Sequence, residues 1–139
     1  MPFFDAHPNL AYSTVATAPS PATTGTSLVV QSGDGANFGS GTVRFNATVW
    51  PAGVRPLVSN AEIVQITNIS TDTFTIVRTQ EGTTARAIGV GDQIAITITK
   101  KDAVDIENAT IQGVYGDGSD GVGTLLERTD DQGRRAYRI

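Results

Sequence analysis

The chain of 139 residues suits a single domain that buries a modest hydrophobic core. Its net charge of −4 argues against nucleic acid as a partner, because phosphate binding requires a basic surface. Cysteine is absent, which excludes disulfides and thiolate metal sites, and no apolar run approaches the roughly 20 residues that a membrane-spanning helix needs.

The first part of the chain, residues 1–25, is predicted to form an extended arm. Residues 12–17 have the pattern of a short strand, whereas residues 18–25 contain two prolines, which lack the backbone donor that a strand ladder uses. The first seven residues lack the charged and apolar regions of a signal peptide, so we expect synthesis in the cytosol without export. Apolar arm residues need a surface to bury against, either on this domain or on another subunit. The interface candidates in the arm are Phe3, Phe4, Leu10 and Tyr12.

The middle of the chain, residues 26–109, is predicted to be the β domain. The charged fraction of 17% is low and Thr is abundant, which favours strands because β-branched side chains pack well on a pleated surface. Trp50 lies on the polar face of its strand, so it either covers a core edge or marks a contact surface. A polar turn between residues 62–69 and 73–78 predicts that these two segments form a hairpin. The segments with strand character are residues 26–32, 43–50, 62–69, 73–78 and 93–99, and the last of these has the clearest alternation.

The last part of the chain contains a predicted helix and a predicted hairpin. Residues 102–109 predict about two helical turns, with Asp102 as the N-cap. Residues 110–139 are predicted to be a Gly-rich connector and a terminal hairpin, whose interface candidates are Arg134, Arg135 and Tyr137. The fold class expected for the whole chain is therefore all-β. It is a small antiparallel barrel or sandwich with an N-terminal arm, one short helix near residues 102–109 and a C-terminal hairpin.

The residue types that carry out catalysis or bind metals are sparse. The single histidine, His7, lies in the predicted arm, where no fixed partner sets its tautomer or pKa. Asp117 and Asp120 form part of a Gly-rich run that either binds a hard cation or makes a tight turn, and its spacing does not fit an EF-hand loop. We therefore predict no enzymatic activity and no cofactor.

The most distinctive run is Arg78-Thr-Gln-Glu-Gly-Thr-Thr-Ala-Arg86. It carries three charges that can converge, on Arg78, Glu81 and Arg86, and Gly82 permits the positive φ of a sharp turn. The threonine hydroxyls can bond to nearby backbone groups. We interpret this run as a structural loop that sets the crossover between two strands, with a binding role as the alternative.

Three runs together resemble a module of tailed-bacteriophage structural proteins. They are Asn60 to Ile69, the run from Thr73 to Arg86, and Gly-Asp-Gln-Ile-Ala ending at Ala95. In that module an E-I-V strand opening precedes T-R-x-Q-E-G-T-T-A-R and G-D-x-I/V, and Val77 stands where the module often has Thr. The run Phe45-Asn-Ala-Thr-Val-Trp-Pro51 and residues 11–21 also look like this family. The resemblance spans roughly residues 3–107.

The resemblance implies a virion protein that is made in the host cytoplasm. In the family, the module often forms the particle-attached end of fibres and of tail or head appendages. Only about thirty residues follow it here, which favours a small accessory protein: a capsid decoration, a head-fibre base or a small tail component. The expected partners are further copies of the chain, in a symmetric oligomer with a trimer as the expected form, and other virion proteins. The alternative is a tip that binds a receptor or host-surface glycan through an aromatic platform, with candidates Trp50, Tyr115 and Tyr137.

Overall fold

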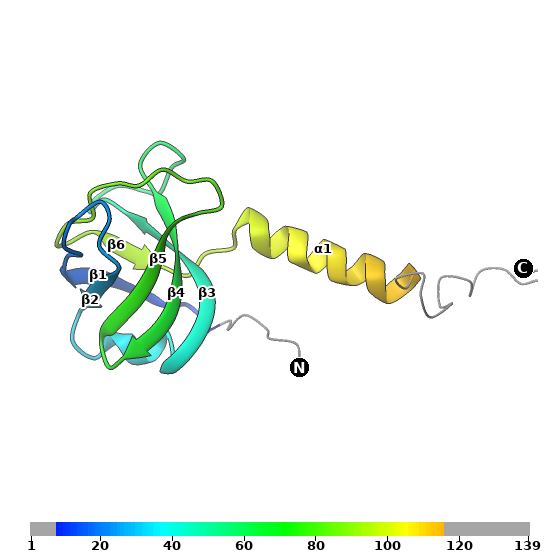
Figure 1. Cartoon of the computed structure of the whole chain (residues 1–139), viewed down its shortest axis with the longest axis horizontal. Helices are drawn as coiled ribbons and strands as arrows, with labels where there is room; N and C mark the ends of the chain where they lie inside the picture. Colours follow the sequence, from blue (N-terminus) through cyan, green and yellow to red (C-terminus); the bar gives the residue numbers. More distant parts are fainter. Residues whose placement is uncertain (1–7, 116–139) are drawn as a thin grey trace, which may run out of the picture. The chain divides into compact units, whose positions relative to one another are not determined.

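The computed structural model describes residues 8–115, and it describes side-chain environments for residues 8–109. The chain divides into two compact units, Met1–Thr97 and Ile98–Ile139. Among the described residues, the strands belong to the first unit and one helix belongs to the second (Figure 1). The predicted all-β class with one helix is therefore confirmed.

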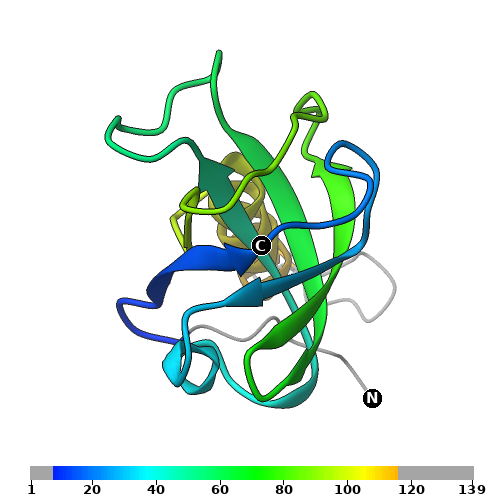
Figure 2. The ribbon, with the colours of Figure 1, turned by 90° about the vertical axis from the view of Figure 1, so that its left-hand side faces the viewer.

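Six antiparallel strands close into a barrel, so the structure has the first of the two predicted architectures. The order around the barrel is β1–β2–β5–β4–β3–β6, and β6 pairs with both β3 and β1 (Figure 2). Closure gives every described strand a neighbour on both sides, although β6 pairs with only residues 48–50 of β3. The strands are β1 (Tyr12–Thr17), β2 (Ser27–Val30), β3 (Gly41–Trp50), β4 (Glu62–Ser70), β5 (Thr73–Gln80) and β6 (Gln93–Ala95), and a 3-10 helix, η1 (Asp34–Asn37), follows β2.

The connections between strands alternate between the two ends of the barrel, because all neighbouring strands are antiparallel. Residues 18–26, 51–61 and 81–92 connect strands at one end, called here the loop end, which is at the top of Figure 2. Residues 31–40 and the tight turn at residues 71–72 lie at the opposite end, called here the turn end. The two ends therefore present different segments of the chain.

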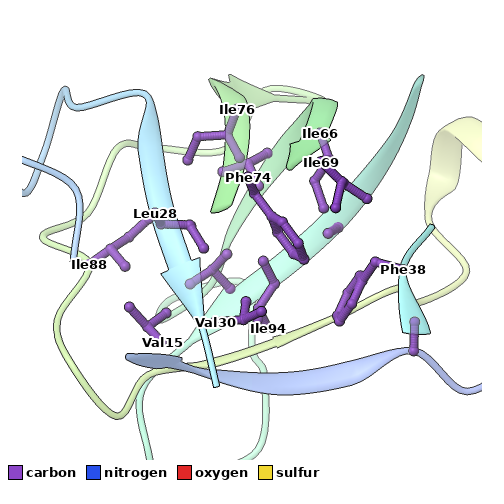
Figure 3. Close-up of a cluster of buried hydrophobic side chains, with 14 of the residues drawn as sticks. Val15, Leu28, Val30, Phe38, Ile66, Ile69, Phe74, Ile76, Ile88 and Ile94 are labelled. Atoms are coloured by element: carbon purple, nitrogen blue, oxygen red, sulfur yellow. The ribbon is translucent and has the colours of Figure 1, made fainter. Parts of the chain in front are cut away.

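The core fills the barrel with side chains that alternate along each strand. Val64 and Ile66 of β4 and Phe74 and Ile76 of β5 are at most 1% exposed, as the period of two in the predicted hairpin requires. Figure 3 shows Phe74 directed toward Phe38, and the centroids of the two rings lie 5.0 Å apart in an edge-on arrangement. Each fully buried side chain of this size stabilises the fold by about 1.5–3 kcal/mol.

Residues 12–25 do not belong to an arm as the sequence predicts, because residues 12–17 form strand β1 of the barrel. Val15 is fully buried in the core, and β1 pairs with β2 on one side and β6 on the other. The segment at residues 18–25 also belongs to the barrel, where Pro19 and Gly25 are buried at the loop end. Only one large apolar side chain in β1 points inward, so the local pattern resembles an arm although closure of the barrel depends on this strand.

The last strand is shorter than predicted: β6 ends at Ala95 and does not continue to residue 99. Ala95 is the last residue that pairs with both neighbours, Tyr12 of β1 and Thr48 of β3. Ile96 still donates its N–H to Ala11 O and packs against the core, but Ile98 is 89% exposed, whereas Ile94 is 0% exposed. The apolar alternation therefore extends past the last residue for which a pairing partner exists.

The helix α1 (Lys100–Tyr115) is longer than predicted at both ends. Its N-cap is Thr99, and Asp102 is the reciprocal partner: the Thr99 N–H donates to Asp102 Oδ2 at 2.9 Å, and the Asp102 N–H donates to Thr99 Oγ1 at 3.5 Å. This is the geometry of a capping box, which satisfies donors at the helix start. The predicted connector begins within the helix, and the predicted C-terminal hairpin lies outside the described residues.

Candidate functional site

A buried ion pair between Arg78 and Glu62 anchors the distinctive run at residues 78–86. Arg78 Nε donates to Glu62 Oε2 at 2.8 Å, and Arg78 Nη2 donates to Glu62 Oε1 at 2.7 Å. The two side chains are 8% and 0% exposed. Glu62 shares the inward face of β4 with Val64 and Ile66, so its charge requires a partner inside the barrel. The two parallel bonds give the geometry in which an arginine binds a carboxylate most strongly.

The guanidinium of Arg78 also bonds to three backbone carbonyls at the loop end. Nη1 donates to Ala22 O at 3.2 Å and to Gly25 O at 3.1 Å, and Nη2 donates to Arg86 O at 2.7 Å. With the two bonds to Glu62, these account for all five N–H groups of a guanidinium. Arg78 thus connects three separate segments of the chain and has no donor left for a ligand.

The carboxylate of Glu62 is equally saturated. Besides the two bonds from Arg78, it accepts the Thr79 N–H at 2.9 Å and the Arg86 N–H at 3.0 Å, so each oxygen accepts two bonds. Burial raises the pKa of Glu62, but the hydrogen bonds from Arg78, Arg86 and Thr79 and the charge of Arg78 outweigh it. The net result is a pKa below the ordinary value of 4.5.

Acidification is expected to remove the contribution of Glu62 to stability. Because its folded-state pKa lies below 4.5, that contribution is fully present above the ordinary value and is lost as pH falls through the lower one. Denaturant unfolding near pH 7 and near pH 3 measures it as the difference in unfolding free energy between the wild type and Glu62→Gln. This difference in unfolding free energy should be smaller near pH 3. The other carboxylates titrate in both proteins, so their contributions cancel in the difference. A difference that is the same at both pH values contradicts the prediction.

The rest of the run at residues 78–86 is fixed by local contacts. Arg86 Nη1 donates to Asp92 Oδ2 at 2.7 Å, and the same oxygen accepts the Gly89 N–H at 2.9 Å. Glu81 Oε2 accepts a bond from Asn46 Nδ2 at 2.7 Å. Gly82 has a φ of 77°, the left-handed conformation that glycine adopts without strain. Arg78, Glu81 and Arg86 thus bond to three different side chains of the barrel unit, those of Glu62, Asn46 and Asp92.

A second loop at the same end, residues 51–61, is held by side chains of the barrel wall. Trp50 Nε1 donates to Val54 O at 2.8 Å, and Gln93 Nε2 donates to Pro51 O at 2.9 Å and to Val54 O at 3.0 Å. Tyr12 donates its hydroxyl to Gln93 Oε1 at 3.0 Å. These bonds fix the beginning of the loop against β3 and β6.

The other half of this loop is fixed by Asn60. Its Oδ1 accepts the Leu57 N–H at 2.8 Å, and its Nδ2 donates to Arg55 O at 3.1 Å. Despite this internal bonding, the aliphatic side chains of the loop face solvent, and Val58 is fully exposed. Beside it lies a hollow of about 440 Å³, lined by Pro51, Val58, Ser59, Asn60, Ala61, Thr84, Ala85 and Arg86.

The turn end carries a cluster of amides whose partner is a carboxylate of the chain itself. The Gly33 N–H lies 3.1 Å from both oxygens of Asp72, and the Gly35 N–H donates to Asp72 Oδ1 at 2.9 Å. Next to it, the hydroxyl of Ser13 donates to Asp34 Oδ2 at 2.7 Å. Since Asp72 occupies these amides, they are not available to an external anion. A hollow of about 300 Å³ adjoins them, lined by Gly33, Ala36, Gly39, Ser40, Thr71 and Asp72.

The structure places few of the predicted interface residues together. Leu10 is 92% exposed at the turn end and Tyr12 is 48% exposed on the barrel wall, whereas Trp50 is 7% exposed with its ring 6.5 Å from that of Tyr12. Trp50 therefore offers little surface as an aromatic platform. Other candidates lie outside the residues whose side chains are described: Phe3, Phe4, His7, Tyr115, Asp117, Asp120, Arg134, Arg135 and Tyr137.

Neither a metal centre nor a membrane-spanning helix is found in the described part of the chain. No three His, Cys, Asp or Glu side chains among residues 8–109 are grouped so that they could hold a metal ion. The one helix described there lacks the length and apolar content for a membrane span.

Comparison with known proteins adds no further assignment. No protein-family model matches the sequence. A search of curated proteins gives no match either. The resemblance of residues 60–95 to a phage module therefore stays a prediction.

Proposed function

We propose that this chain is a non-enzymatic structural protein of a bacteriophage virion. It acts as an accessory protein that assembles as a symmetric oligomer, with a trimer as the expected form, on the particle. On the particle it serves as a capsid decoration protein, as the base of a head fibre or as a small tail component. The proposal begins from the resemblance of the run at residues 60–95 to a virion module, and a feature of the site supports it.

The observation that carries the proposal is the internal bonding of the charged residues of the distinctive run. Arg78 and Glu62 satisfy each other and the surrounding backbone, and Arg86 is paired with Asp92. A catalytic or ligand-binding arginine needs donors directed at the substrate, and Arg78 has none left. The most distinctive residues of the chain therefore serve to hold the barrel together, which is the requirement of a structural component.

The closed barrel also restricts how such a protein can assemble. Every described strand has a neighbour on both sides, which disfavours the addition of a partner strand, although β6 pairs with only residues 48–50 of β3. We therefore expect contacts with other copies or with the particle to use loops and the segments outside the barrel. The structure supplies exposed apolar side chains for this purpose at residues 10 and 54–58.

Deletion of residues 1–7 tests the role of the arm. We expect the full chain to sediment as an oligomer and to associate with purified particles, and we expect the deletion to weaken one or both. The deletion stops before Ala11 because Ala11 is 2% exposed and its carbonyl accepts the Ile96 N–H at 3.1 Å. A longer deletion that included β1 would open the barrel and confuse unfolding with loss of contact.

Mass spectrometry of purified particles of the virus that encodes the chain gives the decisive readout. The protein should be present in stoichiometric amounts relative to a head or tail protein. Its absence from intact particles contradicts the proposed function, whatever the oligomeric state in solution.

A further inference from the structure

The loop end of the barrel presents an aliphatic tip that has no cover among the described residues. Val54, Leu57 and Val58 are 50%, 47% and 104% exposed. Exposed apolar groups clustered on one surface are typical of interaction sites. The loop is already fixed by Trp50, Gln93 and Asn60, so binding would immobilise little additional chain. The tip therefore has the properties of a preorganised binding element.

The charge at this tip is positive and unpaired. Arg55 lies between the exposed aliphatic residues, and no carboxylate in the described part of the chain pairs with its side chain. The other two arginines at this end, Arg78 and Arg86, are paired with Glu62 and Asp92. A partner that covers the tip should therefore combine an apolar recess with negative charge.

The turn end of the same barrel has both features. Its hollow of about 300 Å³ includes Ala36 and three residues without bulky side chains, Gly33, Gly39 and Ser40. Two half-buried carboxylates, Asp34 and Asp72, accept bonds only from a hydroxyl and from backbone amides. No arginine or lysine in the described residues forms an ion pair with either one. This end thus offers two carboxylates to the positive charge of Arg55.

We propose that the loop end of one copy docks on the turn end of a second copy. Leu57 and Val58 enter the hollow beside Ala36, and Arg55 faces Asp34 and Asp72. The two ends lie at opposite poles of the barrel (Figure 2), so the turn end of a copy cannot cover the tip of that same copy. The contact joins two different surfaces and is therefore head-to-tail, the kind of interface that builds rings and rows of subunits. This inference rests on the proposed self-assembly and assigns the surfaces that carry it.

Two exposed substitutions, one at each end, test the contact in the full chain. Val58→Asp places a negative charge on the tip, and Ala36→Arg fills the hollow with a positive one. Both positions are exposed, so each variant should keep the melting temperature of the wild type. In sedimentation velocity, each variant alone should dissociate at concentrations about tenfold or more above those at which the wild type does.

An equimolar mixture of the two variants gives the sharper readout. The Val58→Asp copy retains an intact turn end and the Ala36→Arg copy retains an intact loop end, so one good contact can form. The mixture should therefore regain association, with dimers of one copy of each as the smallest assembled species. Val77→Asp, on the barrel wall at 44% exposure, is the matched control and should assemble as the wild type does.

Three outcomes overturn the inference: a wild type that is monomeric at all concentrations, variants that assemble as the wild type does, or a mixture of folded variants that stays monomeric. The second outcome leaves the proposed virion role intact, because an oligomer then forms through another surface. The proposed function fails by a separate measurement, the absence of the protein from purified particles.

Discussion

Replacing Arg78 with methionine is expected to lower the free energy of unfolding by about 3–5 kcal/mol, because it leaves Glu62 charged and buried without its counter-ion. Glu62 is 0% exposed, so water cannot take the place of the guanidinium. The backbone carbonyls of Ala22, Gly25 and Arg86 lose their donor in the same step. A loss of this size is a large fraction of the stability of a small domain.

Urea unfolding monitored by Trp50 fluorescence measures the effect of this substitution on the free energy of unfolding. If the variant is largely unfolded in plain buffer, a stabilising osmolyte is added to all samples. Arg55→Met is the matched control, since Arg55 is exposed and has no ion pair in the described residues; it should change the unfolding free energy by less than about 0.5 kcal/mol.

The double variant Glu62→Met with Arg78→Met separates the ion pair from the rest of the network. Removing both charges leaves no uncompensated carboxylate, so the double variant should be more stable than Arg78→Met alone. If Arg78→Met costs less than about 1 kcal/mol, or if the two substitutions are additive, the network does not anchor the fold as described.

Replacing Gly35 with alanine is expected to destabilise the barrel by about 2–4 kcal/mol, because there is no space for the added methyl group. A Cβ at this position would lie 1.8 Å from the carbonyl oxygen of Thr71 and 2.9 Å from the Cα of Asp72. Both are backbone atoms of the β4–β5 turn, which cannot move aside without breaking the bonds from Gly33 and Gly35 to Asp72. The turn end would therefore lose its packing and its hydrogen bonds together.

Gly89→Ala provides the control for this substitution. A Cβ at Gly89 meets nothing within 4 Å, its φ is not in the left-handed range, and its N–H bond to Asp92 remains possible with alanine. The control should stay within about 0.5 kcal/mol of the wild type by thermal or urea unfolding. A Gly35→Ala protein with wild-type stability would show that the turn at residues 71–72 adjusts freely.

The central strands could be predicted because their pattern is local. In the β4–β5 hairpin, apolar side chains repeat every second residue on the inward face, and a polar turn separates the two runs. Pairing of Ile66 with Ile76 and of Ile69 with Phe74 follows from that pattern. In β3 the same alternation places Phe45, Ala47 and Val49 in the core.

The first and last strands could not be delimited in this way, because their limits are set by distant partners. β1 has only Val15 as a large inward side chain, and it is a strand because β2 and β6 lie beside it. Conversely, the alternation of Ile94 with Ile98 continues beyond the last available partner of β6. The sequence also left open whether Trp50 covers a core edge or forms a contact surface. In the structure it is buried, because its ring packs near that of Tyr12 and its Nε1 donates to Val54 O.

The candidate site was visible from the sequence only in part. The run at residues 78–86 was distinctive, and the inward position of Glu62 beside Val64 was a signal that this carboxylate needs a buried cation. The identity of that cation depends on the β4–β5 register, in which Ile63 lies opposite Gln80 after an irregularity in the ladder. The acceptors at Ala22 and Gly25 and the role of Asp92 come from contacts between loops, for which the local sequence gives no signal.

Closure of the barrel through β1 and β6 determines the order in which the protein can fold. Tyr12 pairs with Ala95, so the first strand finds its second neighbour only after almost the whole barrel has been synthesised. Loops that join such distant residues form late, because ordering the intervening chain is entropically unfavourable. Until β6 docks, the growing sheet has two open edges, at β1 and β3, to which other nascent chains can add. We therefore expect the yield of folded protein to increase when the whole chain, including β6, is synthesised quickly.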